Sequence, residues 1–300
     1  MRLLETFTDF GRMVKFSHTL FALPFAGLAS IIALLGSSLS KEELIRRLVL
    51  ILVCMASARN AAMGFNRTAD ADIDAENPRT QNREIPSGKI SRMTAWGFTL
   101  FFCFLFVGAS YFINIYTFLL SFPALFIVLF YSYTKRFTWL CHFVLGLGIG
   151  IAPSGAWIAV RDSLSMVPVY WTLGLMFHIA GFDILYSTQD IDFDRSKGLY
   201  SIPSRFGVEK SLWIARTAHI ISLGFLFMGG YSAGLGGIYY IFLIITAALF
   251  AAEHILVKPD DLSKVPIAFF HINASISVIL FLGILADRWN ELVLHFRNLS

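Results

Sequence analysis

The chain has 300 residues, of which 56% are hydrophobic and only 15% are charged. A soluble domain carries about 25% charged residues, so this composition excludes an ordinary water-soluble domain and indicates a membrane protein with several spans. The formal net charge of +4 is modest and gives no reason to expect a nucleic-acid partner.

Nine apolar runs follow one another along the chain, and each is long enough to cross a bilayer as a helix. We therefore predict an all-α fold, a polytopic bundle of nine transmembrane helices that forms one domain over residues 1–300. The first run is longer than the core of a cleavable signal peptide, which spans about 7–15 residues, so we expect it to be retained. The runs cover approximately residues 16–36, 46–66, 95–114, 116–134, 139–160, 168–188, 212–231, 236–257 and 267–286.

Lys and Arg are distributed unevenly between the two sides that these spans define. Sixteen of them lie at the N-terminus and in the loops after the second, fourth, sixth and eighth runs, against six on the opposite side. Cytoplasmic loops are enriched in Lys and Arg, so we predict a cytoplasmic N-terminus and a cytoplasmic site at the long loops 67–94 and 189–211. We expect an integral protein of a bacterial plasma (inner) membrane or an organellar equivalent, surrounded by lipid, with no obligate protein partner.

The cysteines and most histidines do not suggest a site. Cys54, Cys103 and Cys141 lie in apolar runs without a CxxC pair, which argues against a disulfide framework and a zinc site. The histidines in the spans lack metal-ligand spacing, so packing or hydrogen bonding between helices is their expected role. His18 is a candidate for the mouth of a cavity. The glycine-rich sequence GLGIGIAPSG in the fifth run predicts close helix packing.

A polar sequence rich in acids directly follows the second apolar run. Within it Asn66, Asp70 and Asp74 are spaced by four residues, so they share one face if the helix continues. Asp72 lies between them and is expected to point elsewhere.

The same spacing recurs after the sixth run, at Asp190 and Asp194, and Asp183 lies on the same face seven residues earlier. We expect the two acidic helices to face each other across one cavity.

Carboxylates gathered in this way would repel one another, and their charges are costly near hydrocarbon. Mg²⁺ removes this problem, because it takes one or two carboxylates and completes its shell with water and phosphate oxygens. The two acidic clusters therefore predict a diphosphate substrate held through Mg²⁺. A solvated helix end and a carboxylate-dependent ion or proton transporter are the alternatives. The position of the acids at the ends of the spans, beside basic loops, favours the anionic substrate.

Cationic side chains accompany the acids. Arg59 lies within the second run, on the face of Asn66, and is a candidate for binding a ligand or for an internal ion pair. Lys135, at the end of the fourth run, is a candidate phosphate contact or an interfacial anchor. Arg67, Arg79 and Arg83 are placed similarly.

Three of these motifs together resemble the UbiA family of membrane prenyltransferases. NRTADADID fits the NxxxDxxxD signature of the family, DIDFD fits its second DxxxD signature, and YSYTK fits its YxxxK element at Tyr131 and Lys135. NPRTQNREIPSGKIS is similar to a loop of the 4-hydroxybenzoate polyprenyltransferases. The nine predicted spans agree with the nine-helix bundle of the family, so the resemblance covers essentially the whole chain.

The resemblance implies an enzyme that transfers a polyprenyl group from its diphosphate to an aromatic ring, on the way to a quinone. It implies that Asn66, Asp70 and Asp74 bind one Mg²⁺ ion, and that Asp190 and Asp194 bind another. The substrates would be a polyprenyl diphosphate and an aromatic acid such as 4-hydroxybenzoate.

The resemblance further implies that Lys135 and Arg67 contact the diphosphate and that Tyr131 stands near the reacting allylic carbon. Arg59 suits the carboxylate of the acceptor, and we expect Asp183 to orient the acceptor or to help remove its ring proton. Several acceptors stay open, because the family also acts in a futalosine-type menaquinone pathway and on other aromatic rings.

Overall fold

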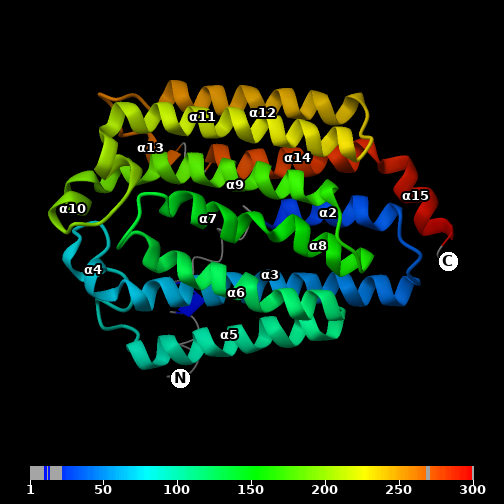
Figure 1. The fold of residues 1–300 in the computed structure, drawn as a ribbon, viewed down its shortest axis with the longest axis horizontal. Helices are drawn as coiled ribbons and strands as arrows, with labels where there is room; N and C mark the ends of the chain where they lie inside the picture. Colours follow the sequence, from blue (N-terminus) through cyan, green and yellow to red (C-terminus); the bar gives the residue numbers. More distant parts are fainter. Residues whose placement is uncertain (1–9, 12, 14–21, 268–270, 299–300) are drawn as a thin grey trace. The chain divides into compact units, whose positions relative to one another are not determined.

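The computed structural model describes residues 10–11, 13, 22–267 and 271–298. In this part of the chain the regular structure is helical, apart from one isolated bridge between Lys258 and Asp261. The predicted all-α class is therefore confirmed. Figure 1 shows the helices in chain order.

The chain divides into two compact units. Unit 1 consists of Met1–Thr19 and Val49–Tyr133, and unit 2 consists of Leu20–Leu48 and Thr134–Ser300. The prediction that residues 1–300 form one domain stays a prediction.

Unit 1 is built from the long helix α3, a short helix and a hairpin of two apolar helices. Only Asn114 separates the two helices of the hairpin, and its side-chain oxygen accepts a hydrogen bond from the backbone N–H of Thr117 at 2.7 Å. This side chain caps the second helix and turns the chain within one residue. The helices are α3 (Lys41–Ala69), which begins in unit 2, α4 (Ala71–Glu76), α5 (Arg92–Ile113) and α6 (Ile115–Thr134).

Unit 2 is arranged around α9 (Met166–Ser187), which packs against α7 (Cys141–Gly150) and α11 (Ile202–Ser232). Helix α2 (Leu23–Leu35) packs against α8 and α14, and α12 packs against α14 and α11. The other elements are α8 (Ala152–Arg161), the 3₁₀ turn η2 (Thr188–Asp190), α10 (Ile191–Ser196), α12 (Gly237–Leu256), α13 (Val265–Ile267), α14 (Asn273–Asp287) and α15 (Trp289–Asn298).

The helices match the predicted spans in order, but the count of nine is not confirmed exactly. Within the described residues, seven helices are long and apolar enough to cross a membrane, whereas α2 and α14 are shorter. The expected first run begins at residue 16, outside the described residues. The fifth run is divided into α7 and α8 at Ile151, two residues before Pro153, which cannot donate a helical hydrogen bond.

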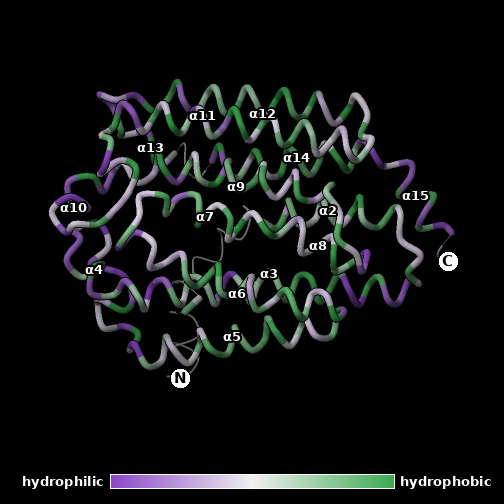
Figure 2. The backbone as a smooth tube through the Cα atoms, in the orientation of Figure 1, coloured by the Kyte–Doolittle hydropathy of each residue, from purple (hydrophilic) through white to green (hydrophobic). Residues whose placement is uncertain are grey.

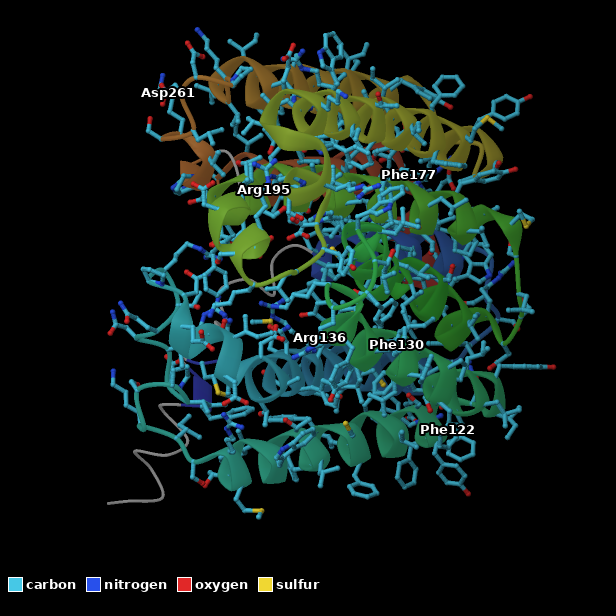
Figure 3. All side chains as sticks on the ribbon, turned by 60° about the vertical axis from the view of Figure 1, so that its left-hand side comes forward. Phe122, Phe130, Arg136, Phe177, Arg195 and Asp261 are labelled. Atoms are coloured by element: carbon cyan, nitrogen blue, oxygen red, sulfur yellow. The ribbon has the colours of Figure 1, made fainter. Side chains whose placement is uncertain are left out.

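Large apolar side chains cover the outside of the helices, as expected for an integral membrane protein. Phe104 of α5 is 76% exposed and Ile244 of α12 is 69% exposed. Phe122 and Phe130 of α6, labelled in Figure 3, are also exposed. Such a surface suits hydrocarbon rather than water. Figure 2 shows hydrophobic colouring along these helices and hydrophilic colouring at α4 and α10.

Glycines bring α7 and α9 into close contact, as the sequence predicts. A Cβ atom at Gly150 would lie 2.9 Å from the carbonyl oxygen of Thr172, and one at Gly146 would collide with the carbonyl oxygen of Met176. Only glycine permits this approach of the two backbones. The approach determines which side chains of α7 reach α9.

Candidate functional site

The first acidic cluster keeps its four-residue spacing across a break between two helices. Asp70 separates α3 from α4, yet its backbone N–H donates to the carbonyl of Asn66 at 2.9 Å and its carbonyl accepts from Asp74 at 2.8 Å. The side-chain amide of Asn66 donates to Oδ2 of Asp70 at 3.1 Å. Asp70 and Asp74 are both buried. Burial makes these charges costly unless a cation compensates them.

Arg83 compensates the charge of Asp74. Its Nη1 donates to both carboxylate oxygens of Asp74, each at 2.7 Å. The loop that carries Arg83 folds back on α4, because the hydroxyl of Thr80 donates to the carbonyl of Asp74 at 3.0 Å. The sequence analysis gives Arg83 as a candidate phosphate contact or interfacial anchor, but it does not predict its pairing with Asp74. The Asn77–Pro78 turn signal between the acids and Arg83 is the feature that predicts such a reversal.

Two arginines of α3 and one tyrosine of α6 extend this cluster. The buried Arg67 interacts electrostatically with Asp74, Arg83 and Tyr131. Arg59 interacts electrostatically with the same tyrosine. The structure therefore brings together Asn66, Arg67, Asp70, Asp74 and Arg83, with Tyr131 and Arg59 beside them.

Asp72 points away from the cluster, as expected. It is exposed and forms an ion pair with Arg92, the first residue of α5. The hydrogen bond from Arg92 lowers the pKa of the Asp72 carboxyl below its usual value. Asp72 is thus the solvent-facing counterpart of the buried Asp70.

The second acidic cluster belongs to unit 2, where the 3₁₀ turn η2 joins α9 to α10. Oδ2 of Asp194 accepts a hydrogen bond from the hydroxyl of Ser201 at 2.9 Å. Asp194 also interacts electrostatically with Asp190 and Lys135. The carbonyl of Lys135 accepts from the backbone N–H of Tyr200 at 2.7 Å. The structure thus brings Lys135, Asp190 and Asp194 together.

One further polar contact is made by α10, and another joins α9 to α7. Nε of Arg195, labelled in Figure 3, donates to the carbonyl of Ser204 at 3.0 Å.

Asp183, in the preceding helix α9, lies beside a histidine. Nδ1 of His142 is 2.7 Å from Oδ2 of Asp183, and the sequence does not predict His142 as a site residue. The sequence offers no signal for this pair, since the two residues lie 41 positions apart.

The side chains of the first cluster suit a hard divalent cation. Asn66, Asp70 and Asp74 offer only oxygen ligands, which Mg²⁺ prefers. Among the described residues no three His, Cys, Asp or Glu side chains converge on one point that could hold a metal ion. That the two clusters face each other stays a prediction, and His18 lies outside the described residues.

Comparisons with known proteins agree on one family. The sequence model described as "UbiA prenyltransferase family" matches residues 22–275. The 4-hydroxybenzoate octaprenyltransferase of Pseudomonas entomophila (strain L48) is 31% identical over 268 residues, covering 84% of this chain and 83% of that protein.

Two solved structures are similar to this one. A UbiA homolog from Aeropyrum pernix K1, solved in its apo form, has 30% identity and a TM-score of 0.80, covering 90% of this chain and 98% of that one. A UbiA homolog from Archaeoglobus fulgidus bound to DMAPP and Mg²⁺ has a TM-score of 0.69 over 93% of this chain and 99% of that one. Its identity is 19%, so this second likeness shows the fold alone.

Proposed function

Because this chain belongs to the UbiA prenyltransferase family and is a membrane-embedded prenyltransferase, we propose that it transfers a polyprenyl group from polyprenyl diphosphate to an aromatic acid. The acceptor is 4-hydroxybenzoate or a close analogue, in keeping with the names of relatives such as the Pseudomonas enzyme. The product is a prenylated aromatic acid that enters quinone biosynthesis. The reaction takes place at the cytoplasmic side of a bacterial inner membrane.

The observation that carries this proposal is the buried cluster at the junction of α3 and α4. It holds two carboxylates, a neighbouring amide and two arginines at the end of a membrane-length helix. A site for an anion bound through metal needs this mixture of carboxylate and guanidinium groups.

We assign Asn66, Asp70 and Asp74 to one Mg²⁺ ion and Asp190 and Asp194 to a second. When bound, Mg²⁺ would neutralise negative charge on the diphosphate and make it a better leaving group. Support for a divalent metal comes from the Archaeoglobus relative, whose structure contains Mg²⁺ together with DMAPP.

The chain's own cations act on the same charge. Arg67 in unit 1 and Lys135 in unit 2 are assigned to the oxygens of the diphosphate, whose charge grows as the allylic C–O bond breaks. Both electrons of that bond leave with the diphosphate. Tyr131 stands near the allylic carbon, where its ring stabilises positive charge.

The acceptor ring then forms a new C–C bond to the allylic carbon and loses its ring proton. Arg59 binds the carboxylate of the acceptor, and its place within a spanning helix keeps this interaction away from bulk water. Asp183 orients the acceptor and helps to remove the proton.

The proposal is tested with membranes that contain the protein, labelled polyprenyl diphosphate, Mg²⁺ and a panel of aromatic acids. The panel includes 4-hydroxybenzoate and a dihydroxynaphthoate, and label is followed into a lipid-soluble aromatic product. We expect product with 4-hydroxybenzoate that disappears with EDTA. Product with a naphthoate alone would move the protein to a menaquinone-type pathway. The absence of product with every acid, combined with ion flux that depends on Asp70, would favour a transporter.

A further inference from the structure

His142 is held by hydrogen bonds at both nitrogens of its ring. It is the second residue of α7, and its side chain is 3% exposed. The backbone nitrogen of Ile202 lies 3.1 Å from Nε2. A backbone N–H can only donate, so Nε2 must carry a lone pair and no proton.

The other ring nitrogen then carries the proton. Nδ1 lies 2.7 Å from Oδ2 of Asp183, and its N–H donates to that oxygen. The two contacts together specify a neutral imidazole with its proton on Nδ1. Asp183 is thereby the acceptor of a directed hydrogen bond from α7.

The local fold explains why His142 occupies this position. Ile202 is the first residue of α11, where backbone N–H groups have no partner within the helix. Ser201 caps this helix, because its hydroxyl accepts from the N–H of Ser204 at 3.1 Å. Gly207, with a φ of 80°, then turns the first segment of α11 away from the rest. Because Ile202 stands at the first position of the helix, its N–H is available to His142.

Ser201 and Ile202 connect two carboxylates of unit 2. The hydroxyl of Ser201 donates to Asp194, while Ile202 is joined to Asp183 through His142. Seven residues separate Asp183 from Asp190, which is about 10 Å along a helix. Asp183 therefore lies deeper along the helix than Asp190 and Asp194, the acids assigned to Mg²⁺. At this position it is better placed to contact the acceptor ring than the diphosphate.

Asp183 keeps part of its surface accessible in spite of this bond. Its side chain is 24% exposed, whereas that of His142 is almost completely covered. Among the described residues, His142 is the one side chain that hydrogen-bonds the Asp183 carboxylate. Asp183 can therefore meet a ligand, but His142 cannot reach one directly.

We propose that His142 is a positioning residue for prenyl transfer, which holds the Asp183 carboxylate toward the acceptor and connects it to the start of α11. This inference rests on the proposed function through the role of Asp183. His142 keeps its proton throughout. If His142 instead relayed the proton released by the acceptor ring, Nε2 would have to gain a proton. That proton would point at the N–H of Ile202, which is itself a donor.

Three substitutions separate these roles. H142Q retains a donor for Asp183 and an acceptor for Ile202, but its amide group cannot take up or release a proton as an imidazole can. H142N retains the donor for Asp183 and is too short for Ile202. H142L retains neither bond. S154A is the matched control, because it removes a 2.7 Å bond from Ser154 to Thr172 of the same helix α9, three turns before Asp183.

We expect H142Q and S154A to stay within about threefold of wild type in kcat/KM for the acceptor. H142L should lose about ten- to a hundredfold, the effect of removing one hydrogen bond to a charged group. KM for the polyprenyl diphosphate should not change in H142L. H142N should keep most of the acceptor activity but show a lower Tm, because Ile202 loses its acceptor.

Wild-type acceptor kinetics in H142L would overturn the inference. So would a folded H142Q that is as inactive as H142L, which would indicate proton transfer through the imidazole. If H142L does not fold, H142N tests the inference in its place. A fall of about tenfold or more in the kcat/KM of H142N for the acceptor would show that the bond to Ile202, and so a purely structural role, accounts for the effect. A wild-type protein without any prenyl transfer would instead refute the proposed function, and the inference with it.

Discussion

Both carboxylate oxygens of Asp74 accept hydrogen bonds from Nη1 of Arg83, each at 2.7 Å. Asp74 is one of the acids assigned to Mg²⁺, so its charge is compensated by the chain itself when no cation is bound. Under the proposed function, a metal ion and Arg83 would compete for this carboxylate. If Mg²⁺ took Asp74, the guanidinium of Arg83 would become available for a phosphate oxygen.

The variant R83Q tests this competition without an activity assay. It leaves a buried carboxylate without its partly exposed cation, so we expect a loss of about 1–3 kcal/mol in the free energy of unfolding when Mg²⁺ is absent. Mg²⁺ should then raise the Tm of R83Q more than that of wild type, because the ion replaces the missing charge. Thermal unfolding in detergent with EDTA or Mg²⁺ measures both effects. Equal Mg²⁺ shifts in the two proteins would exclude Asp74 as a ligand.

Asp70 and Asp72 form a matched pair for mutagenesis, because they are two residues apart and differ in burial. D70N should reduce prenyl transfer at least a hundredfold, roughly the loss of one strong electrostatic contribution to the transition state. D72N removes only an exposed ion pair with Arg92 and should retain activity. Label incorporation at saturating substrates measures this difference. A D72N variant as inactive as D70N would show that the loop, rather than the buried carboxylate, is required.

Arg59 is expected to bind the acceptor and not the diphosphate. R59Q should raise KM for the aromatic acid about tenfold or more, since it removes a charged hydrogen bond to a carboxylate. KM for the polyprenyl diphosphate should stay near its wild-type value. Steady-state kinetics with each substrate varied in turn provide the test. A change confined to the diphosphate would move Arg59 to the other substrate.

A chain of buried polar side chains stabilises unit 2 between α9, α12 and α14. His178 Nε2 lies 2.9 Å from Oδ1 of Asn273, whose amide donates to Oε1 of Glu253 at 2.9 Å. His219 and His254 extend the chain, with 3.0 Å between their ring nitrogens. The predicted role of these histidines, hydrogen bonding between helices, is confirmed.

The variant N273L interrupts this chain at its centre. We expect a loss of about 1–3 kcal/mol in stability, because the partners in Glu253 and His178 are left buried without a hydrogen bond. N298A, in the terminal helix α15, serves as an exposed control that should unfold like wild type. Unfolding in detergent, followed by circular dichroism, compares them. An unchanged midpoint in N273L would mean that water replaces the lost amide.

The spans and the spacing of the acids could be predicted from the sequence, because a helix in hydrocarbon must satisfy its own backbone and be apolar along its length. Asn66, Asp70 and Asp74 keep the predicted four-residue spacing for the same reason. The pairing of Asp183 with His142 could not be predicted in this way. It depends on how closely Gly146 and Gly150 let α7 approach α9, and a local pattern does not contain that distance.

The contact between Asp74 and Arg83 could not be predicted from the spacing of the acids either. The path of the loop determines which of its several basic residues comes close to the carboxylates. The division of the fifth run at Ile151 and the 3₁₀ turn before α10 are local features that the run of apolar residues does not predict. Both are short deviations that an average over twenty apolar residues conceals.

Helix α3 has 29 residues, which corresponds to about 43 Å at 1.5 Å per residue. The hydrocarbon core of a bilayer is only about 30 Å thick, so a helix of this length extends into the headgroup layer. The carboxylates of Asp70 and Asp74, which follow its C-terminal end, then lie at the depth where a lipid changes from an oily chain to a charged head. A polyprenyl diphosphate makes the same change at the same depth. Under the proposed function, the enzyme would therefore meet its donor sideways within the leaflet, and no methylene group would need to be withdrawn from the bilayer at about 0.8 kcal/mol each.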